Sequence, residues 1–357
     1  MTTRRPARPA PMLGGGFYTR HSRLQSGGSA FALPMIGPAI AAIPDLGGGP
    51  PVIADYGSAQ GGNSLAPMGL ALAALRQRLG AQPPVSVVHV DQPDNDFATL
   101  FHLLEENEAS YRRSDPRAFA SAVGRSHFEQ VLPDETVAFG WCAFAVHWLS
   151  RAPVGVAGHV WGRMTPPAAR AALAAQSAQD WRAFLACRAR ELRPGAALLV
   201  VQPTVADEAA TTFPVMMAWA QAQIDALADA GALRPAERER LTVWLFERTP
   251  EAIRAPFAAG EAAGLILAEE RLDQRPDPFW VAYQENGDAA ALAAGQIGFF
   301  RGAFAPSLLA GLDADRPGAE REALLGRLLS GLEARMAAAP SALLEPLTVH
   351  AGLIVKR

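Results

Sequence analysis

Two segments of the chain place acidic and amide side chains directly after apolar runs. In "VIADYGSAQGGN", residues 52–63, Asp55 precedes a glycine-rich loop, and in "VVHVDQPDND", residues 87–96, Asp91 ends the run. Glycines after a first strand let the backbone approach a ligand closely, and an acid after the second strand can accept hydrogen bonds from both hydroxyls of a ribose. The pattern predicts a nucleoside-binding edge of a parallel sheet, although an ordinary strand-to-helix turn uses the same residues.

Asp55 indicates which nucleoside cofactor fits this edge. The loop "GSAQGGN" does not have the GxGxxG spacing, and no Arg or Lys follows it to meet a pyrophosphate. A carboxylate immediately before the loop would repel a pyrophosphate but attract the ammonium group of a methionyl chain. We therefore expect S-adenosylmethionine (SAM), with S-adenosylhomocysteine (SAH) as its product, rather than a nicotinamide dinucleotide. Farther along, Asn95 and Asp96 are predicted to cap a helix, and Asp94 to be solvated.

Apolar, β-rich runs alternate with helical patterns in the first two hundred residues or so. Strands are predicted at 52–56, 85–91, 196–203 and the start of 136–150, and helices at 64–79, 95–110 and 179–195, the last stopped by Pro194-Gly195. Strands that alternate with helices are typical of a parallel sheet covered on both faces. The fold class is therefore predicted as α/β, with a Rossmann-like core and a mostly parallel sheet.

The pattern changes near Asp207, after which the chain is helical until apolar runs near 263–272 and 347–357. We expect a core of residues 12–206 and 262–357, with a mainly helical cap over the substrate pocket at 207–261, extending at most to about 310. Residues 1–11 contain a twin arginine but no apolar segment follows it, so a disordered leader is expected there rather than an export signal.

The composition excludes several classes of protein. Of 357 residues, 50% are hydrophobic and the net charge is −3, which argues against disorder and against binding to nucleic acid or an anionic membrane. The histidines show no HxxxH spacing and there is no CxxC pair, so no metal site is expected. Cys142 and Cys187 are predicted to be reduced thiols, and the longest apolar run is too short to span a bilayer. The protein is expected to be cytoplasmic.

Longer stretches resemble one family of enzymes. "ADYGSAQGGNSL", "VVHVDQPDNDFATLF" and "HFEQVLPDETVAFGWCAFAVHWLSRAP" resemble the SABATH methyltransferases, the salicylate, benzoate and theobromine methyltransferase group. "GGFYTRHSRLQ" and "ALADAGALRPAERERLTVWLFERTPEAI" are similar to the opening and cap segments of that family. The similarity runs in the same order over nearly the whole chain from Met12, and the chain is identified as a bacterial-type member.

The resemblance implies transfer of a methyl group from SAM to the carboxylate of a small, aromatic or apolar acid, and it implies a homodimer. It assigns cofactor contacts to Ser22, Gln25, Asp55, Gly57, Asn63, Asp91, Gln92, Ser126 and His127. It assigns substrate contacts to Gln25, Phe144, His147 and Trp148. Met217 and Trp219 in the cap segment are further candidates for substrate contacts, but they fit a helix core equally well. The sequence departs from the family at three positions: Phe144 replaces a tyrosine, His21 an asparagine and His127 a phenylalanine.

The predicted chemistry needs no acid or base. A carboxylic acid with a pKa of about 4 is already ionised near neutrality, so the protein has only to position it. Gln25, His147 and Trp148 offer neutral N–H donors that could hold one carboxylate oxygen and leave the other free to react. Two alternatives stay open: an N-methyltransferase of a small heterocycle, as in some members of the family, and a protein that binds SAM and a small acid without turnover.

Overall fold

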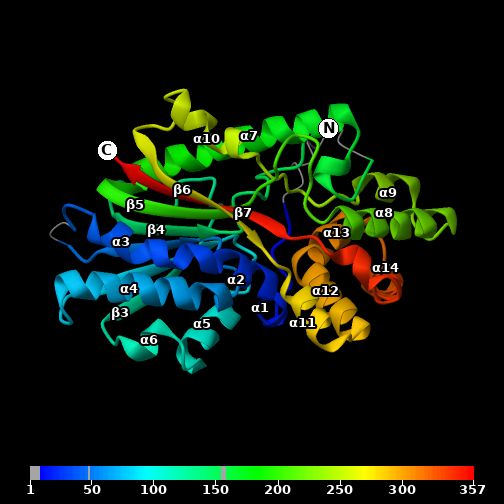
Figure 1. Ribbon diagram of the computed structural model, residues 1–357, viewed down its shortest axis with the longest axis horizontal. Helices are drawn as coiled ribbons and strands as arrows, with labels where there is room; N and C mark the ends of the chain where they lie inside the picture. The colour runs from blue at the N-terminus through cyan, green and yellow to red at the C-terminus, as the bar shows by residue number, and fades with distance from the viewer. Residues whose placement is uncertain (1–8, 47–48, 154–157) are drawn as a thin grey trace.

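A computed structural model describes residues 9–46, 49–153 and 158–357, and its centre is one seven-stranded sheet (Figure 1). The strand order is β3-β2-β1-β4-β5-β7-β6. The strands are β1 Val52–Tyr56, β2 Val85–Asp91, β3 Ala118–Gly124, β4 Val137–Ala143, β5 Leu192–Pro203, β6 Leu265–Arg275 and β7 Leu347–Lys356. Strands β1 to β5 pair in parallel, and β7 runs antiparallel to both of its neighbours. The prediction of an α/β fold with a mostly parallel sheet is confirmed.

The sheet is buried because its central strands are apolar on both faces. On one face Ile53 and Phe139 pack with Ile40 and Leu72 from the helices α3 (Ile36–Ala41) and α4 (Leu65–Leu79). On the other face Tyr56 and its neighbours pack against α7 (Pro167–Glu191) and α10 (Pro250–Ala258). Figure 1 shows these helices on opposite sides of the sheet. Burial of both faces is typical of parallel sheets and leaves only the strand ends for a ligand.

A second group of helices gathers beyond the carboxyl ends of the parallel strands (Figure 1). It comprises α8 Pro214–Asp229, α9 Pro235–Arg240, α11 Pro278–Asn286, α12 Ala289–Ala303, α13 Ala305–Gly311 and α14 Gly318–Ala338. Two separate chain segments therefore form it, one before and one after β6. The expected cap at 207–261 contains α8 and α9, and its extension to about 310 would add α11, α12 and most of α13 but not α14. Within 207–261, α10 instead packs on the sheet with α7 and β6.

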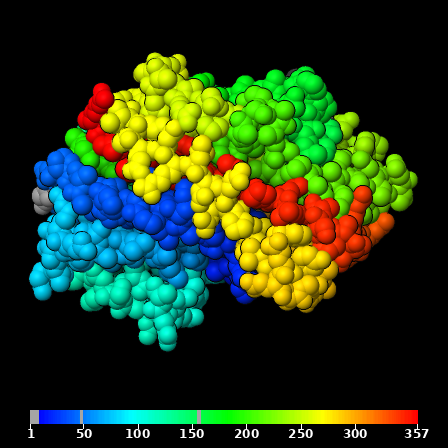
Figure 2. All heavy atoms as spheres, in the orientation of Figure 1, coloured from blue at the N-terminus to red at the C-terminus, as the bar shows by residue number. Residues whose placement is uncertain are grey.

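The N-terminal helices α1 (Phe17–His21) and α2 (Arg23–Ser29) lie between the sheet and this helical group, where α1 packs against α12 and α2 against α11. On the face shown in Figure 2, the blue N-terminal part touches both the cyan helices and the yellow-orange ones. The rest of the regular structure is short except for α5. It consists of α5 Phe97–Glu106, α6 Tyr111–Ser114, η1 Ala30–Met35, η2 Gly62–Ser64, η3 Gly162–Met164 and η4 Pro340–Leu343.

Three sequence predictions need correction. The strand β3 was not predicted, because its exposed edge position gives "AFASAVG" a weak apolar pattern. The helix α7 starts at Pro167 rather than near 179 and ends at Glu191, before the Pro194-Gly195 pair, which lies within β5. Of the expected leader, residues 1–8 lie outside the described residues, whereas Ala10 and Pro11 line the cleft described next.

Candidate active site

A cleft of about 860 Å³ opens at the carboxyl ends of β1, β2 and β4, and we call it the donor cleft. Loops after these three strands and the N-terminal helices supply its walls. It brings together eight of the nine predicted cofactor residues and several that were not predicted. The lining includes Tyr18, Thr19, Ser22, Gln25, Asp55, Gly57, Ser58, Gln60, Asn63, Asp91, Gln92, His127, Phe144 and Trp148. Of the predicted set, only Ser126 is missing from this wall.

The turn after β1 is fixed by close packing against the loop after β4. Gly57 has a φ of +89°, and a Cβ there would lie 2.3 Å from the Cβ of Ala145. Its backbone N–H donates to the carbonyl of Val90 on β2, at 2.8 Å. Only glycine meets both conditions, since an L side chain is strained at this φ and has no room. The glycine noted in the sequence therefore serves a close approach between two loops.

The polar residues that follow β2 hold the loop that follows β1. Asp91 accepts hydrogen bonds from the backbone N–H of Ala59 and from that of Gln92, both at 2.7 Å. The Asn95 amide donates to the carbonyl of Ala59 at 2.7 Å, so Ala59, which has a φ of +45°, is held at both its polar groups. Asp96 caps α5 through Thr99, as predicted. Asn95 contributes to the loop rather than to the cap.

Asp55 is buried at the end of β1 and belongs to a chain of side-chain hydrogen bonds. Its Oδ2 accepts from Ser64 Oγ at 2.5 Å and lies 3.0 Å from Nδ1 of His89. Nε2 of His89 is 2.8 Å from the hydroxyl of Tyr111, and strand pairing sets Asp55 beside His89. A buried carboxylate with several hydrogen-bond partners keeps one orientation. Asp55 lines the cleft, so its remaining capacity to accept hydrogen bonds is directed there.

Burial shifts the acidity of two cleft residues. The surroundings of Asp91 raise the pKa of its carboxyl to about 6, mainly because little water reaches it, although its two backbone hydrogen bonds act in the opposite direction. The pKa of His127 falls to about 3 because burial and the charge of Arg188 disfavour the imidazolium. His127 is therefore neutral near pH 7, and Asp91 is mostly ionised.

The cleft suits a nucleoside that carries positive charge. Thr19 Oγ1, Ser58 Oγ and His127 Nε2 are buried and have no hydrogen-bond partner among the described residues. The residues that line the described cleft include the carboxylates Asp55 and Asp91 but no Lys or Arg. Free polar atoms and uncompensated negative charge fit the hydroxyls, ammonium and sulfonium of SAM, whereas a pyrophosphate would find no counter-charge.

A second, mainly apolar pocket adjoins the donor cleft, and we call it the aromatic pocket. Its rings come from distant parts of the chain. They are Tyr18, Phe144, His147, Trp148, Trp161, Phe213, Phe299 and Phe304, and they are joined by Thr212, Leu245 and Glu247. Gln25, Phe144 and Trp148 line both cavities, so a ligand in one would meet a ligand in the other at these side chains.

The predicted positioning residues stand at this junction with free polar groups. Gln25 and Trp148 line both cavities, and Oε1 of Gln25 is buried without a hydrogen-bond partner among the residues of the described ranges. Nδ1 of His147 is also buried and unpaired, and burial beside Arg248 lowers the pKa of His147 to about 3. All three side chains are therefore neutral at pH 7 and can donate an N–H to an anion.

Phe144, where the resemblance leads us to expect a tyrosine, packs tightly at the tip of its ring. A Cβ at Gly28 of α2 would lie 2.5 Å from Cζ, the tip of the Phe144 ring. The ring tip therefore packs directly on backbone, where a tyrosine hydroxyl would have to be accommodated. Phe144 itself has a φ of +53°, which places its ring at the junction of the two cavities.

Three predicted contacts lie elsewhere. Ser126 lines an adjoining groove that shares Gln92, His127 and Trp148 with the donor cleft. Met217 is fully buried in the hydrophobic core. Trp219 packs under the guanidinium of Arg335, 5.3 Å from its ring centre. Neither Met217 nor Trp219 is among the described residues that line the donor cleft or the aromatic pocket, which fits the helix-core alternative for both.

Sequence reasoning missed much of the aromatic pocket. Trp161, Phe213 and Phe304 lie far from one another in the sequence, and no periodic pattern marks them as neighbours. The residues missed in the donor cleft are different, because Ser58 and Gln60 lie inside the quoted glycine loop and could have been included. Within the described residues, no cluster of three or more His, Cys, Asp or Glu side chains could hold a metal ion.

Comparison with known proteins decides the family. A family model described as SAM dependent carboxyl methyltransferase matches residues 13–258. The chain is a SABATH methyltransferase. Its relatives include the O-methyltransferase acrG of Aspergillus aculeatus, 30% identical over 75% of this chain and 73% of that one. The methyltransferase FUS9 of Gibberella moniliformis is 33% identical over 40% of this chain and only 39% of its own length.

The fold of this SABATH methyltransferase is also that of a solved relative. The structure of a loganic acid methyltransferase with SAH superimposes with a TM-score of 0.77, covers 97% of this chain and 98% of that chain, and is 19% identical in sequence. The agreement extends over both the sheet and the helical group. No helix in the described ranges is long and apolar enough to cross a membrane.

Proposed function

We propose that this SABATH protein transfers a methyl group from SAM to the carboxylate of a small aromatic or apolar acid, giving a methyl ester and SAH. One observation supports the proposal most strongly. The donor cleft, which suits a cationic nucleoside, meets the aromatic pocket at Gln25 and Trp148, two neutral side chains that carry N–H groups. That junction is where a bound acid would have to present its carboxylate.

When bound, SAM supplies a methyl group on a positively charged sulfur, and the acid oxygen that receives it becomes a methyl ester. Asp91 would accept hydrogen bonds from the ribose hydroxyls, and Asp55 would attract the ammonium group. Gly57, Asn63 and Ser22 would complete the wall around the methionyl part. Ser126, Gln92 and His127, which border the adjoining groove, would lie beside the adenine.

The residues at the junction would position the acid without changing its charge. Gln25, Trp148 and neutral His147 can donate to one carboxylate oxygen and leave the other exposed toward the donor cleft. Neither cavity has a described Lys or Arg in its wall, so no salt bridge would withdraw charge from the reacting oxygen. Positioning alone can supply several kcal/mol, about 7–11 at most. The helical group of α8, α9 and α11 to α14 would act as the cap that excludes water.

The test is to incubate purified protein with SAM carrying a labelled methyl group and a library of small acids, and to look for products one methyl heavier. Methyl esters that hydrolyse in mild base identify transfer to oxygen. Base-stable products from heterocycles such as xanthines would instead establish the N-methyltransferase alternative, and SAH binding with no product from either set would establish a binding protein. The proposal also includes a homodimer and a cytoplasmic location. Light scattering after size exclusion can check the homodimer.

A further inference from the structure

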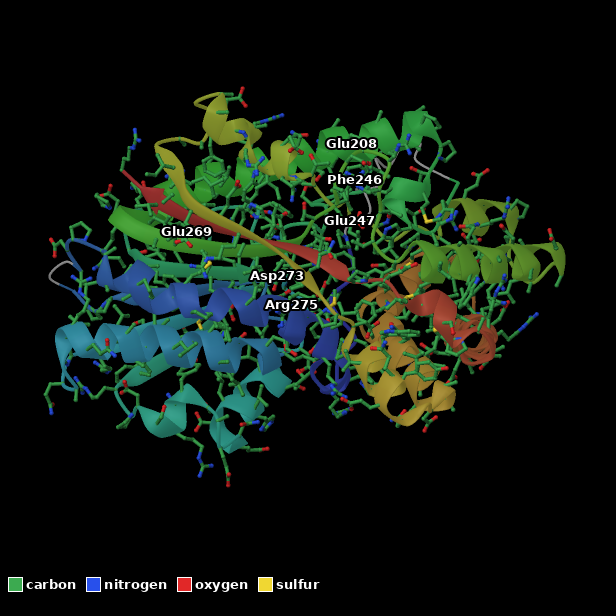
Figure 3. The ribbon with its side chains drawn as sticks, viewed as in Figure 1. Glu208, Phe246, Glu247, Glu269, Asp273 and Arg275 are labelled. Atoms are coloured by element: carbon green, nitrogen blue, oxygen red, sulfur yellow. The ribbon has the colours of Figure 1, made fainter. Side chains whose placement is uncertain are left out.

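The aromatic pocket contains a buried carboxylate that the proposed transfer does not use. Glu247 lies in an extended segment that pairs with the loop after β4. In this pairing Leu245 forms a β-bridge with Trp148, and the N–H of Phe246 donates to the carbonyl of His147. Its side chain is fully buried and lines the pocket. Figure 3 shows Glu247 and Phe246 together between the sheet and the helical group, with Glu208 nearby.

The two oxygens of Glu247 are in unequal surroundings. Oε1 accepts hydrogen bonds from the indole N–H of Trp161 at 3.2 Å and from the backbone N–H of Thr212 at 3.2 Å, and also from the hydroxyl of Thr212. Oε2 has no hydrogen-bond partner among the described residues. A buried carboxylate oxygen without a donor is costly, so an unpaired one in the wall of a cavity indicates that a ligand supplies the donor.

Arg163 compensates the charge of Glu247 without satisfying this oxygen. Its nearest nitrogen, Nε, is 3.9 Å from Oε2, which is too far for a hydrogen bond. The guanidinium instead donates to carbonyl oxygens, among them that of Glu247 itself at 2.9 and 3.0 Å and that of Glu208 at 3.1 Å. Oε2 therefore keeps its full capacity to accept.

Aromatic rings separate this acceptor from the carboxylate-positioning end of the pocket. The ring of Trp148 packs 6.2 Å from that of Phe304, and Phe304 packs 5.3 Å from Trp161, whose N–H reaches Glu247. An acid held at Trp148 would thus lay an apolar body along these rings and present its far end to Glu247. A second carboxylate at that end would meet like charge.

We propose that Glu247 determines specificity, and that the acceptor is an acid with a hydroxyl or N–H donor on the end of its apolar body opposite the reacting carboxylate. This inference rests on the proposed function, and it narrows the substrate class from small apolar acids to hydroxylated or amino-substituted ones. A site built to bind a donor rejects an analogue without one far more strongly than an apolar pocket does.

The test compares matched acids on the unaltered protein. Cinnamate, 4-hydroxycinnamate, 4-aminocinnamate, 4-methoxycinnamate and 4-carboxycinnamate share one body, and the 3- and 4-substituted benzoates form a shorter series. We expect the hydroxy or amino member of at least one series to exceed its unsubstituted, methoxy and carboxy analogues at least about tenfold in kcat/KM. Equal values throughout both series would overturn the inference without the need for any variant.

Two variants then assign the preference to a residue. Glu247→Gln can keep the hydrogen bonds from Trp161 and Thr212 on its amide oxygen while replacing Oε2 with an N–H donor. The preference should fall to within about threefold of unity or reverse in favour of the methoxy acid, with SAH affinity unchanged. Glu208→Gln is the matched control, because Glu208 contacts Arg163 at 3.5 Å but is exposed and outside the pocket. It should keep the preference, and a preference unchanged in Glu247→Gln would overturn the assignment.

A binding measurement separates this inference from the proposed function. Calorimetric titration of SAH-loaded protein with the same acids reports the pocket whether or not a methyl group is transferred. Tighter binding of the hydroxy or amino acids without any methylated product would contradict the proposed reaction and support the role of Glu247. Methylation and binding that do not depend on the substituent at the far end would support the proposed reaction and contradict the role of Glu247.

Discussion

The donor cleft and the aromatic pocket share Gln25, Phe144 and Trp148 but are built in opposite ways. In the donor cleft, polar groups come from a few loops and are tied to backbone, as Asp91 and Asn95 are to Ala59. In the aromatic pocket, rings from widely separated segments meet and pack on one another. Local hydrogen bonds therefore fix the shape of the donor cleft. The shape of the aromatic pocket depends instead on long-range packing, so substitutions can alter it more easily.

The most severe break in the donor cleft should come from Asp91→Ala. This change removes the proposed ribose acceptor and also the anchor of the Ala59 N–H. We expect the affinity for SAH to fall about 100-fold or more, because hydrogen bonds to a charged, partly buried group are worth about 1.5–3 kcal/mol each. Isothermal titration with SAH measures the loss.

Asp94→Ala is the control for that measurement. Asp94 lies three residues away in the same polar segment but is exposed, and none of the described residues forms a hydrogen bond with its side chain. Its removal should change SAH affinity less than about twofold. If the two alanine variants bound SAH equally well, Asp91 would not hold the cofactor and the description of the donor cleft as a tied, local site would fail.

The rigidity of the donor cleft can be tested separately with Gly57→Ala. The added Cβ would overlap that of Ala145 and force an L side chain to a φ of +89°, so the free energy of unfolding should fall by about 2–3 kcal/mol. Denaturant titration measures it. Gly69→Ala in α4 is the matched control, since its Cβ would meet nothing within 4 Å, and it should be neutral or stabilise by up to about 1 kcal/mol.

The same contrast explains how much the sequence could predict. Asp55, Gly57 and Asp91 lie at strand ends, where the apolar pattern locates them, and parallel pairing then brings the strand ends together. Nothing local shows that Glu247 lies in the pocket or that Trp219 does not, because both depend on how the helical segments on either side of β6 pack. Periodicity marks a residue as buried in a helix or strand but does not say which partner buries it.

At the junction of the two cavities, Trp148→Phe should impair methylation of the acid more than binding of SAH. The ring remains but the N–H proposed to hold the acid carboxylate is lost, so kcat/KM for the best acid should fall about 10- to 100-fold. SAH affinity should change less than about threefold. Trp219→Phe makes the same substitution outside both cavities and should leave the kinetics unaltered. An unchanged rate in Trp148→Phe would remove this residue from acid positioning.

The smallest effect is a pH dependence confined to the donor cleft. Asp91 has a pKa of about 6 in the free protein, and its ionised form is the better acceptor for ribose hydroxyls, so SAH affinity should weaken as pH falls through 6. Between pH 7.5 and pH 5 the loss should be about tenfold, since one pKa unit corresponds to a factor of ten. His127 and His147, with pKa values of about 3, stay neutral over this range and do not contribute. Titration of Asp91→Asn provides the comparison: its weaker affinity should be flat over the same pH range, and a slope that persisted in this variant would assign the dependence to another group.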